Sequence, residues 1–255
     1  MMKTITLPYR NIYNGYLILV NEKYPYHGKI TRKDLKSVNA FEKNVLLEQS
    51  TVEFLSRAME EIDGWKQICA VSGWRSFQEQ KEIYAQSMID NGEIFTQQFV
   101  ALPGHSEHQT GLAVDLGLKK EQIDFIRPDF PYSGICNVFR QRSISYGFIE
   151  RYPEGKEHIT GIAYEPWHFR YVGNTHAEIM NDKNYCLEEY INFIKQFPYG
   201  KAPYIWETES HEIAISYIAS NTNGSDTEFQ IAEDISYSIS GNNVDGYIIT
   251  EWRQA

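Results

Sequence analysis

Two short stretches of this chain bring together the residue types of a catalytic zinc site. The first contains His108 and Asp115, and the second contains Glu165 three residues before His168. Two imidazoles and one carboxylate leave the fourth position of a tetrahedral zinc open, which distinguishes a catalytic site from a structural one. Glu165 then stands where a general base is needed to take a proton from water. The pattern therefore predicts metal-assisted hydrolysis, with His108, Asp115 and His168 as the ligands.

The residues around Asp115 favour a strand with one packed face and one open face. Alternation over residues 111–116 places Asp115 on the same face as Gly111 and Ala113, and bulky side chains on the opposite face. Two residues with almost no side chain leave room beside the carboxylate for an ion and a substrate. A strand built only for packing would more naturally fill both faces, so this pattern favours a site.

The second stretch is expected to be extended as well. Pro166 disfavours a helical conformation at Glu165, and the aromatic and β-branched content of residues 168–173 predicts a strand. The chain also lacks the H-E-x-x-H motif of the helical zinc proteases. We therefore expect a site built from two neighbouring strand ends and one loop.

Each of these residues has an ordinary explanation when it is taken alone. A single histidine is usually packed or exposed without a ligand, and an aspartate near a strand end is usually a turn former. Two histidines and one carboxylate also occur in redox iron sites, but that chemistry does not call for Glu165. The other histidines have no comparable carboxylate spacing. The combined pattern therefore favours zinc.

These motifs resemble the signature of the zinc D,D-peptidases of the vancomycin-resistance type. Ser-x-His-x-x-Gly-x-Ala-x-Asp at residues 106–115 and Glu-x-x-His at residues 165–168 follow Ser-Gly-Trp-Arg-Ser at residues 72–76, in the family order. The resemblance covers about residues 1–198. It implies a hedgehog/D-Ala-D-Ala-peptidase-like α+β fold, in which a small antiparallel sheet with flanking helices carries one Zn²⁺ per chain.

The resemblance also implies roles that the residue pattern alone does not assign. It makes Arg75 the cation at the reacting carbonyl, and Ser106 and Gln80 contacts of the substrate. We expect Trp167 to form part of the wall of the substrate pocket. The pattern by itself favours a solvated helix face for Gln80 and a surface ion pair of little energetic value for Arg75.

The implied reaction is hydrolysis of the dipeptide D-Ala-D-Ala and removal of the terminal D-Ala from peptidoglycan pentapeptide precursors. Loss of these ends deprives glycopeptide antibiotics such as vancomycin of their target. Two alternatives stay open. The first is an L,D-carboxypeptidase or endopeptidase of peptidoglycan, and the second is a non-catalytic module that binds wall fragments.

The amino-acid composition limits the possible binding partners and the cellular location of the protein. The chain has 24 Lys and Arg against 34 Asp and Glu, a formal charge of −10, which disfavours nucleic acid and anionic membrane as partners. A small peptide substrate fits better. The N-terminal region has no apolar run long enough for a secretion signal or a membrane span, which predicts a cytoplasmic protein. Its three cysteines suit neither a disulfide framework nor a zinc cluster.

Helical and strand patterns alternate through the first 198 residues. Capping boxes at Ser50 and Ser76 are expected to begin two helices, and Asn91-Gly92 is expected to end the second. Further expectations are a buried strand at residues 68–71, a loop at residues 94–104, and helices at residues 137–146 and 187–197.

Composition changes after Pro198, where Lys and Arg become scarce. Turn signals at Asn223-Gly224 and at residues 241–243 separate strand-like segments at residues 212–219, 228–239 and 246–252. We therefore predict two domains, a catalytic domain at residues 1–198 and a small β-rich appendage at residues 199–255. The appendage carries no chemical motif, so a stabilising role and a homodimer contact both stay open.

Overall fold

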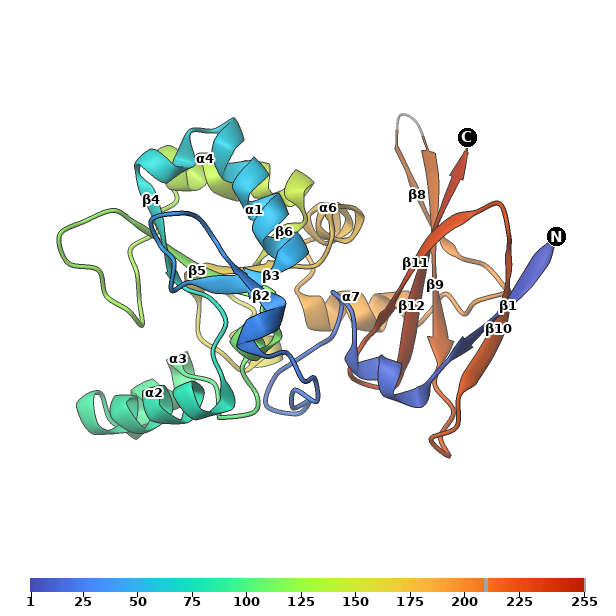
Figure 1. Cartoon of the computed structure of the whole chain (residues 1–255), viewed down its shortest axis with the longest axis horizontal. Coiled ribbons are helices and arrows are strands. Elements are labelled where there is room, and N and C mark those ends of the chain that lie inside the picture. The colour runs from blue at the N-terminus through green and yellow to red at the C-terminus, as the bar shows by residue number, and fades with distance from the viewer. Residues whose placement is uncertain (209–210, 255) are drawn as a thin grey trace. The chain divides into compact units, whose positions relative to one another are not determined.

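The computed structural model describes residues 1–208 and 211–254, and the chain forms two compact units. One unit comprises residues 20–186, and the other combines residues 1–19 with residues 187–255 (Figure 1). These ranges differ from the predicted division at residue 198. The reason is a pairing between the first strand of the chain and a strand more than 200 residues later, which local sequence patterns do not reveal.

The larger unit is built on a four-stranded antiparallel sheet with the strand order β4-β5-β7-β6. Its strands are β4 (Ile68–Ser72), β5 (Ala113–Leu118), β6 (Phe148–Tyr152) and β7 (Glu165–Tyr171). A separate antiparallel pair consists of β2 (Leu35–Ser37) and β3 (Leu46–Glu48). Because β5 and β7 are central in the larger sheet, their side chains are buried on both faces.

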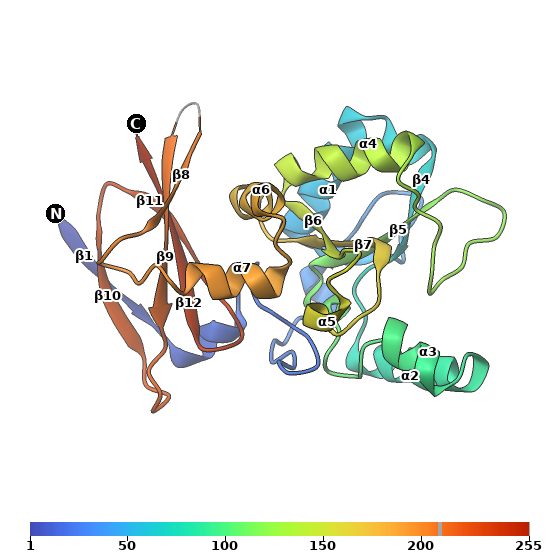
Figure 2. The ribbon, with the colours of Figure 1, turned by 180° about the vertical axis from the view of Figure 1, so that it is seen from behind.

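Helices flank this sheet, with α1 and α4 together on one side and α2 and α3 on the other (Figures 1 and 2). The helices are α1 (Gln49–Glu61), α2 (Phe77–Asp90), α3 (Glu93–Phe99), α4 (Gly134–Ser143), α5 (Glu157–Thr160) and α6 (Asn174–Lys183). Short 3-10 turns are η2 (Arg32–Asp34), η3 (Gly64–Lys66), η4 (Glu107–Thr110) and η5 (Ile144–Tyr146).

The two predicted capping boxes have different outcomes. The box at Ser76 is confirmed, because its hydroxyl accepts the amide of Glu79 and the Glu79 carboxylate accepts the amide of Ser76. The box at Ser50 is wrong. Glu48 is the N-cap of α1 instead, and its carboxylate accepts the backbone amides of Ser50 and Thr51. An acidic side chain there also complements the positive end of the helix.

The loop expected at residues 94–104 is a helix in its first half, where α3 extends to Phe99. Seven residues are too few to form a stable helix alone. Packing against α2 supports α3, and the buried hydroxyls of Ser87 and Thr96 lie 2.8 Å apart between the two helices. The sequence pattern missed α3 because its stability comes from this tertiary contact.

The strand expected from residue 111 begins at Ala113, because Gly111 ends the η4 turn in a left-handed conformation with φ +71°. A Cβ atom at this position would lie 3.0 Å from the Leu35 side chain and 3.1 Å from the backbone nitrogen of Glu48. Glycine therefore serves both the turn and the close approach to β3. The turn places η4 directly before β5.

The smaller unit is rich in β-structure, as expected. Its main sheet has the order β11-β12-β9-β8, and a second pair joins β1 and β10. Its elements are β1 (Met2–Leu7), η1 (Tyr9–Tyr13), α7 (Leu187–Ile194), β8 (Tyr204–Glu207), β9 (His211–Ala219), β10 (Thr227–Ala232), β11 (Ser236–Gly241) and β12 (Gly246–Gln254). The single segment expected at residues 228–239 is therefore two strands in different sheets.

The core of the smaller unit joins both ends of the chain. Leu7 and Ile12 pack with Tyr247 and Ile249 in one buried cluster. At Gly241, an added Cβ atom would lie 2.2 Å from the carbonyl oxygen of Ile12, so the η1 backbone packs directly on β11. This contact explains why residues 1–19 belong with the C-terminal strands.

The thiols of Cys69, Cys136 and Cys186 are buried, and burial raises the pKa of Cys136 to about 11. Within the described parts of the chain, we find no helix with the length and apolar character that a bilayer crossing requires.

Candidate active site

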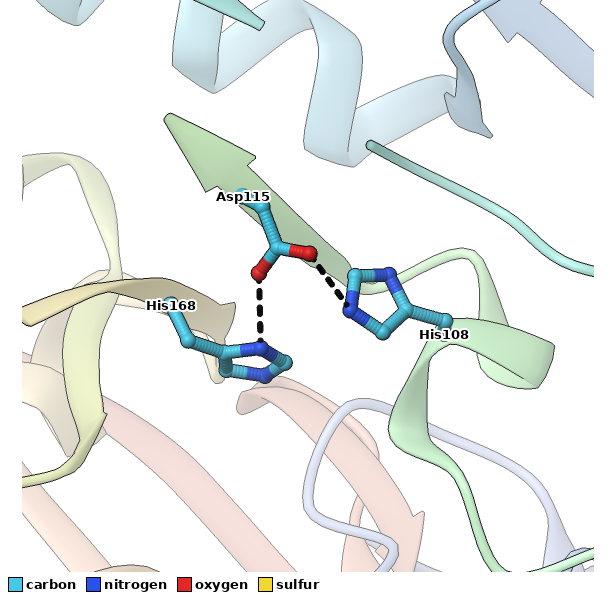
Figure 3. Close-up of side chains that lie close together, drawn as sticks. All are labelled: His108, Asp115 and His168. Atoms are coloured by element: carbon cyan, nitrogen blue, oxygen red, sulfur yellow. Dashed lines mark hydrogen bonds and ion pairs between the residues drawn. The ribbon is translucent and has the colours of Figure 1, made fainter. Parts of the chain in front are cut away.

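The structure brings the three predicted metal ligands together from three different elements (Figure 3). Asp115 in β5 and His168 in β7 are direct partners across the two central strands of the sheet. His108 lies in η4, which Gly111 connects to β5. The antiparallel register and the glycine turn therefore place the three side chains beside one another.

The three ligand atoms are arranged around the Asp115 carboxylate. Oδ2 of Asp115 lies 3.1 Å from Nε2 of His108, and Oδ1 lies 2.9 Å from Nδ1 of His168. One nitrogen or oxygen atom from each residue lies within 4.8 Å of the others, and all three side chains are buried. Zinc binds such atoms at about 2.0–2.2 Å, so modest adjustments suffice to enclose an ion between them.

The ring nitrogen of His108 that does not face Asp115, here called its outer nitrogen, is held by a backbone carbonyl group. Its Nδ1 lies 2.7 Å from the carbonyl oxygen of Gly73, which only accepts hydrogen bonds. This contact places the proton on Nδ1 and directs the lone pair of Nε2 toward Asp115, in the tautomer that a metal ligand needs.

The pKa shifts of the three residues also favour binding of a cation. Burial, reinforced by the nearby Arg75, lowers the pKa of His108 to about 4, so this imidazole is neutral at physiological pH. Burial opposes ionisation of Asp115, but His108 and His168 hold the pKa of its carboxyl well below the usual range. Although burial has the opposite effect, hydrogen bonding to Asp115 raises the pKa of His168 to about 9. A metal ion would displace the proton that His168 shares with Asp115.

Glu165 is the first residue of β7, and its Oε2 lies 3.7 Å from Nδ1 of His168. It pairs across the sheet with Tyr152, beside an irregularity in the β6–β7 register. The side chain is 7% exposed, and burial raises the pKa of its carboxyl to about 8. A carboxyl with a pKa near neutrality can both accept and return a proton.

Arg75 lies in the segment after β4 and contacts the Asp115 carboxylate. Its Nη2 donates to Oδ2 of Asp115 at 2.9 Å, and its Nε donates to the hydroxyl of Ser72 at 2.9 Å. The guanidinium also lies over the ring of Phe125, 5.4 Å from its centre. These contacts hold a cation beside the metal ligands. They differ from the surface ion pair that the residue pattern alone favoured for Arg75.

A single pocket is lined by all eight residues that the sequence singled out. Beyond the ligands, Glu165 and Arg75, these are Ser106, Gln80 and Trp167. Gln80 is fully buried, and its amide donates to the carbonyl oxygen of Ala101 at 2.8 Å. The solvated helix face that composition favoured for Gln80 is therefore wrong.

Among the other residues of the pocket, Glu107 and Tyr152 approach the metal ligand His168, and neither had a predicted role. Glu107 precedes His108, and its carboxylate is enclosed by Arg151 and Arg170. The ring of Tyr152 packs against His168, with 4.9 Å between the ring centres. Glu107 had one sequence signal, its position inside the Ser-x-His motif, but a glutamate in a short turn is usually solvated.

Comparison with known proteins identifies the family. The model of the VanY family, described as D-alanyl-D-alanine carboxypeptidase, matches residues 46–174. The bifunctional D-Ala-D-Ala dipeptidase and D-Ala-D-Ala carboxypeptidase VanXYC of Enterococcus gallinarum is 41% identical over 71% of this chain and 95% of its own length.

The chain belongs to the VanY family. Among solved structures, the vancomycin-resistance D,D-dipeptidase VanXYg, in complex with a D-Ala-D-Ala phosphinate analogue, is 48% identical, with a TM-score of 0.95. The match covers 99% of this chain and 100% of that one. The β-rich unit is therefore shared with VanXYg, and the predicted α+β fold of this VanY-family protein is confirmed.

A more distant VanY-family structure bears on the metal. A VanY variant from a VanB-type resistance cassette, solved in complex with Zn(II), is 28% identical. It has a TM-score of 0.59 and matches over 69% of this chain and 99% of its own. Zinc is thus a cofactor of this family, in agreement with the donor set that the present structure shows.

Proposed function

We propose that this VanY-family protein is a zinc D,D-peptidase that hydrolyses D-Ala-D-Ala and removes the terminal D-Ala from peptidoglycan pentapeptide precursors. One observation carries the proposal. The His108–Asp115–His168 cluster shares a buried pocket with Glu165 and Arg75, which supply a base and a cation beside it. The proposal implies resistance to glycopeptide antibiotics such as vancomycin, because the enzyme would remove the ends that they bind.

His108, Asp115 and His168 would hold one Zn²⁺ through Nε2, the carboxylate and Nδ1, the atoms that face one another. When bound, zinc supplies Lewis-acid polarisation of a carbonyl and lowers the pKa of a water molecule toward neutrality. The sheet fixes Asp115 and His168 on adjacent central strands, which gives the site the rigidity that catalysis needs.

Glu165 is the general base in this proposal. It takes a proton from water as the water oxygen adds to the carbonyl carbon of the penultimate D-Ala. When the carbon–nitrogen bond breaks, Glu165 returns the proton to the departing amine. Its carboxyl is buried, and burial raises its pKa to about 8. A pKa shifted toward neutrality suits a group that both accepts and returns a proton.

Arg75 stabilises the negative charge that develops on the carbonyl oxygen, since its guanidinium lies beside the ligand carboxylate in the pocket. Ser106 and Gln80 contact the substrate termini, and Trp167 forms part of the pocket wall. The burial of all three supports these roles, because solvent-exposed side chains could not exclude water from the reaction.

The decisive assay compares two substrates side by side. Release of D-Ala is measured from D-Ala-D-Ala and from a pentapeptide precursor, with and without a zinc chelator. We expect both substrates to be cleaved and the chelator to stop both reactions. Cleavage of a tetrapeptide instead would favour an L,D-carboxypeptidase, cleavage of assembled wall an endopeptidase, and binding without cleavage a non-catalytic module.

Two further properties stay predictions. A cytoplasmic location would place the enzyme where free dipeptide and soluble precursors are made, and cell fractionation tests it. A homodimer formed through the β-rich unit is tested by light scattering of the purified protein. Neither property alters the roles proposed for the pocket residues.

A further inference from the structure

Glu107 precedes the metal ligand His108 in the chain and belongs to a buried charged cluster. Its Oε1 accepts hydrogen bonds from Nε of Arg151 at 2.8 Å and from Nη1 of Arg170 at 2.7 Å. The side chains of Glu107 and of both arginines are 0% exposed. Burying a carboxylate with two guanidiniums costs desolvation energy that a packing role alone does not require. The cluster therefore indicates a role beyond packing.

The other carboxylate oxygen of Glu107 faces a metal ligand. Its Oε2 lies 3.7 Å from Nε2 of His168, and no hydrogen-bond partner is found for either atom among the described residues. Buried polar atoms are rarely left without partners. Two such atoms beside each other, one able to donate and one able only to accept, are complementary. An approach of about 0.7 Å would give an ordinary hydrogen bond.

The two ligand histidines differ in which nitrogen faces Asp115. His108 presents Nε2 and has its outer Nδ1 fixed by the carbonyl oxygen of Gly73. His168 presents Nδ1 to Asp115 (Figure 3), so the other ring nitrogen is Nε2. That Nε2 lies 3.7 Å from Oε2 of Glu107. Glu107 therefore occupies, for His168, the position that Gly73 occupies for His108.

We propose that Glu107 is the positioning residue of the metal site. Its Oε2 accepts the proton carried by Nε2 of His168, and this commits Nδ1 of His168 to the metal. Arg151 and Arg170 hold the carboxylate in place through Oε1. A carboxylate behind a ligand imidazole fixes the tautomer, restrains the ring and raises the basicity of the coordinating nitrogen. The inference rests on the proposed function, because it assumes that His168 binds zinc.

The tautomer is read from the unmodified protein loaded with zinc, by the ¹⁵N shifts and long-range ¹H–¹⁵N couplings of the His168 ring. We expect a protonated Nε2 and a metal-bound Nδ1. Coordination through Nε2, or a proton absent from it, would overturn the inference. Failure of the protein to bind zinc at all would instead overturn the proposed function, so the two failures are distinguishable.

The second measurement is the zinc dissociation constant of Glu107→Gln. Glutamine keeps the shape of the side chain and loses the charge, and loss of such an outer partner typically weakens metal binding by about 10- to 100-fold. Glu150→Gln is the control, because Glu150 of β6 is a partly buried carboxylate that pairs with Arg140 of α4 and does not line the pocket of the metal site. We expect weakened binding only in Glu107→Gln. Equal zinc affinity in the two variants would contradict the role of Glu107.

Discussion

Nη2 of Arg75 and Nε2 of His108 approach the same oxygen atom, Oδ2 of Asp115, at 2.9 Å and 3.1 Å. A ligand carboxylate is therefore shared between a permanent cation and an imidazole. The arrangement keeps the guanidinium beside the candidate metal ligands. It also means that a change at Arg75 must be tested for effects on both rate and metal binding.

Replacement of Arg75 by lysine is expected to reduce kcat while zinc binding is retained. Lysine keeps the charge but not the planar fork that contacts Ser72, Gln80 and Asp115 together. Loss of one oxyanion stabiliser typically costs about 100- to 1,000-fold in kcat. Steady-state kinetics and metal analysis on the same preparation provide the measurement, and a zinc-free variant would show that Arg75 serves the metal rather than the carbonyl.

Glu165→Gln is expected to bind one zinc ion per chain and to lose turnover. The amide has nearly the same shape but cannot take a proton from water, and removal of a general base typically lowers the rate by about 100- to 10,000-fold. Glu157→Gln, an exposed carboxylate in α5, is the control. Turnover of Glu165→Gln near that of the control would refute the assignment of the base.

Gly111→Ala tests whether the turn before β5 sets the geometry of the site. A methyl group at this position is unfavourable because the backbone is left-handed and because Leu35 and Glu48 crowd the Cβ atom. The backbone strain alone costs about 1–3 kcal/mol. Gly155→Ala is a control with φ +82° and open space around the new Cβ. We expect a larger fall in unfolding free energy and in zinc affinity at residue 111, and equal effects would contradict this.

Acid destabilisation should depend on His176. Burial lowers the pKa of this side chain to about 4, whereas an unfolded histidine titrates at about 6.5. Between these values the unfolded chain binds a proton that the folded protein does not, so stability is full above about pH 6.5 and falls as the pH approaches 4. The unfolding free energy of His176→Gln should decline less between pH 7 and pH 5 than that of His158→Gln, an exposed control. Equal declines would contradict the prediction.

The sequence pattern pointed to residues that the structure brings together, whereas it did not indicate the division into the two compact units. His108, Asp115, Glu165 and His168 stand at spacings that metal chemistry explains, and the structure places all four in one pocket. The resemblance added Arg75, which the pattern alone left as a surface residue. Residues with specific chemistry can be recognised by their type and spacing in the sequence, without knowledge of the tertiary contacts.

Contacts between distant segments explain what the sequence did not predict. The pairing of β1 with β10 and the packing of η1 on Gly241 join segments more than 200 residues apart, and no local period encodes such contacts. The short helix α3 depends on α2 for its stability. The contacts of Glu107 were likewise not predicted, because only the fold brings Arg151 and Arg170 around it.

The proposed hydrolysis depends on one metal ion held by three side chains beside a proton acceptor. The most direct test adds zinc stepwise to chelator-treated protein and follows bound zinc and D-Ala release from D-Ala-D-Ala in the same samples. Hydrolysis is predicted to rise in proportion to zinc and to saturate at one ion per chain. Full hydrolysis by metal-free protein, or one bound ion without hydrolysis of any D-Ala-terminated peptide, would contradict the account.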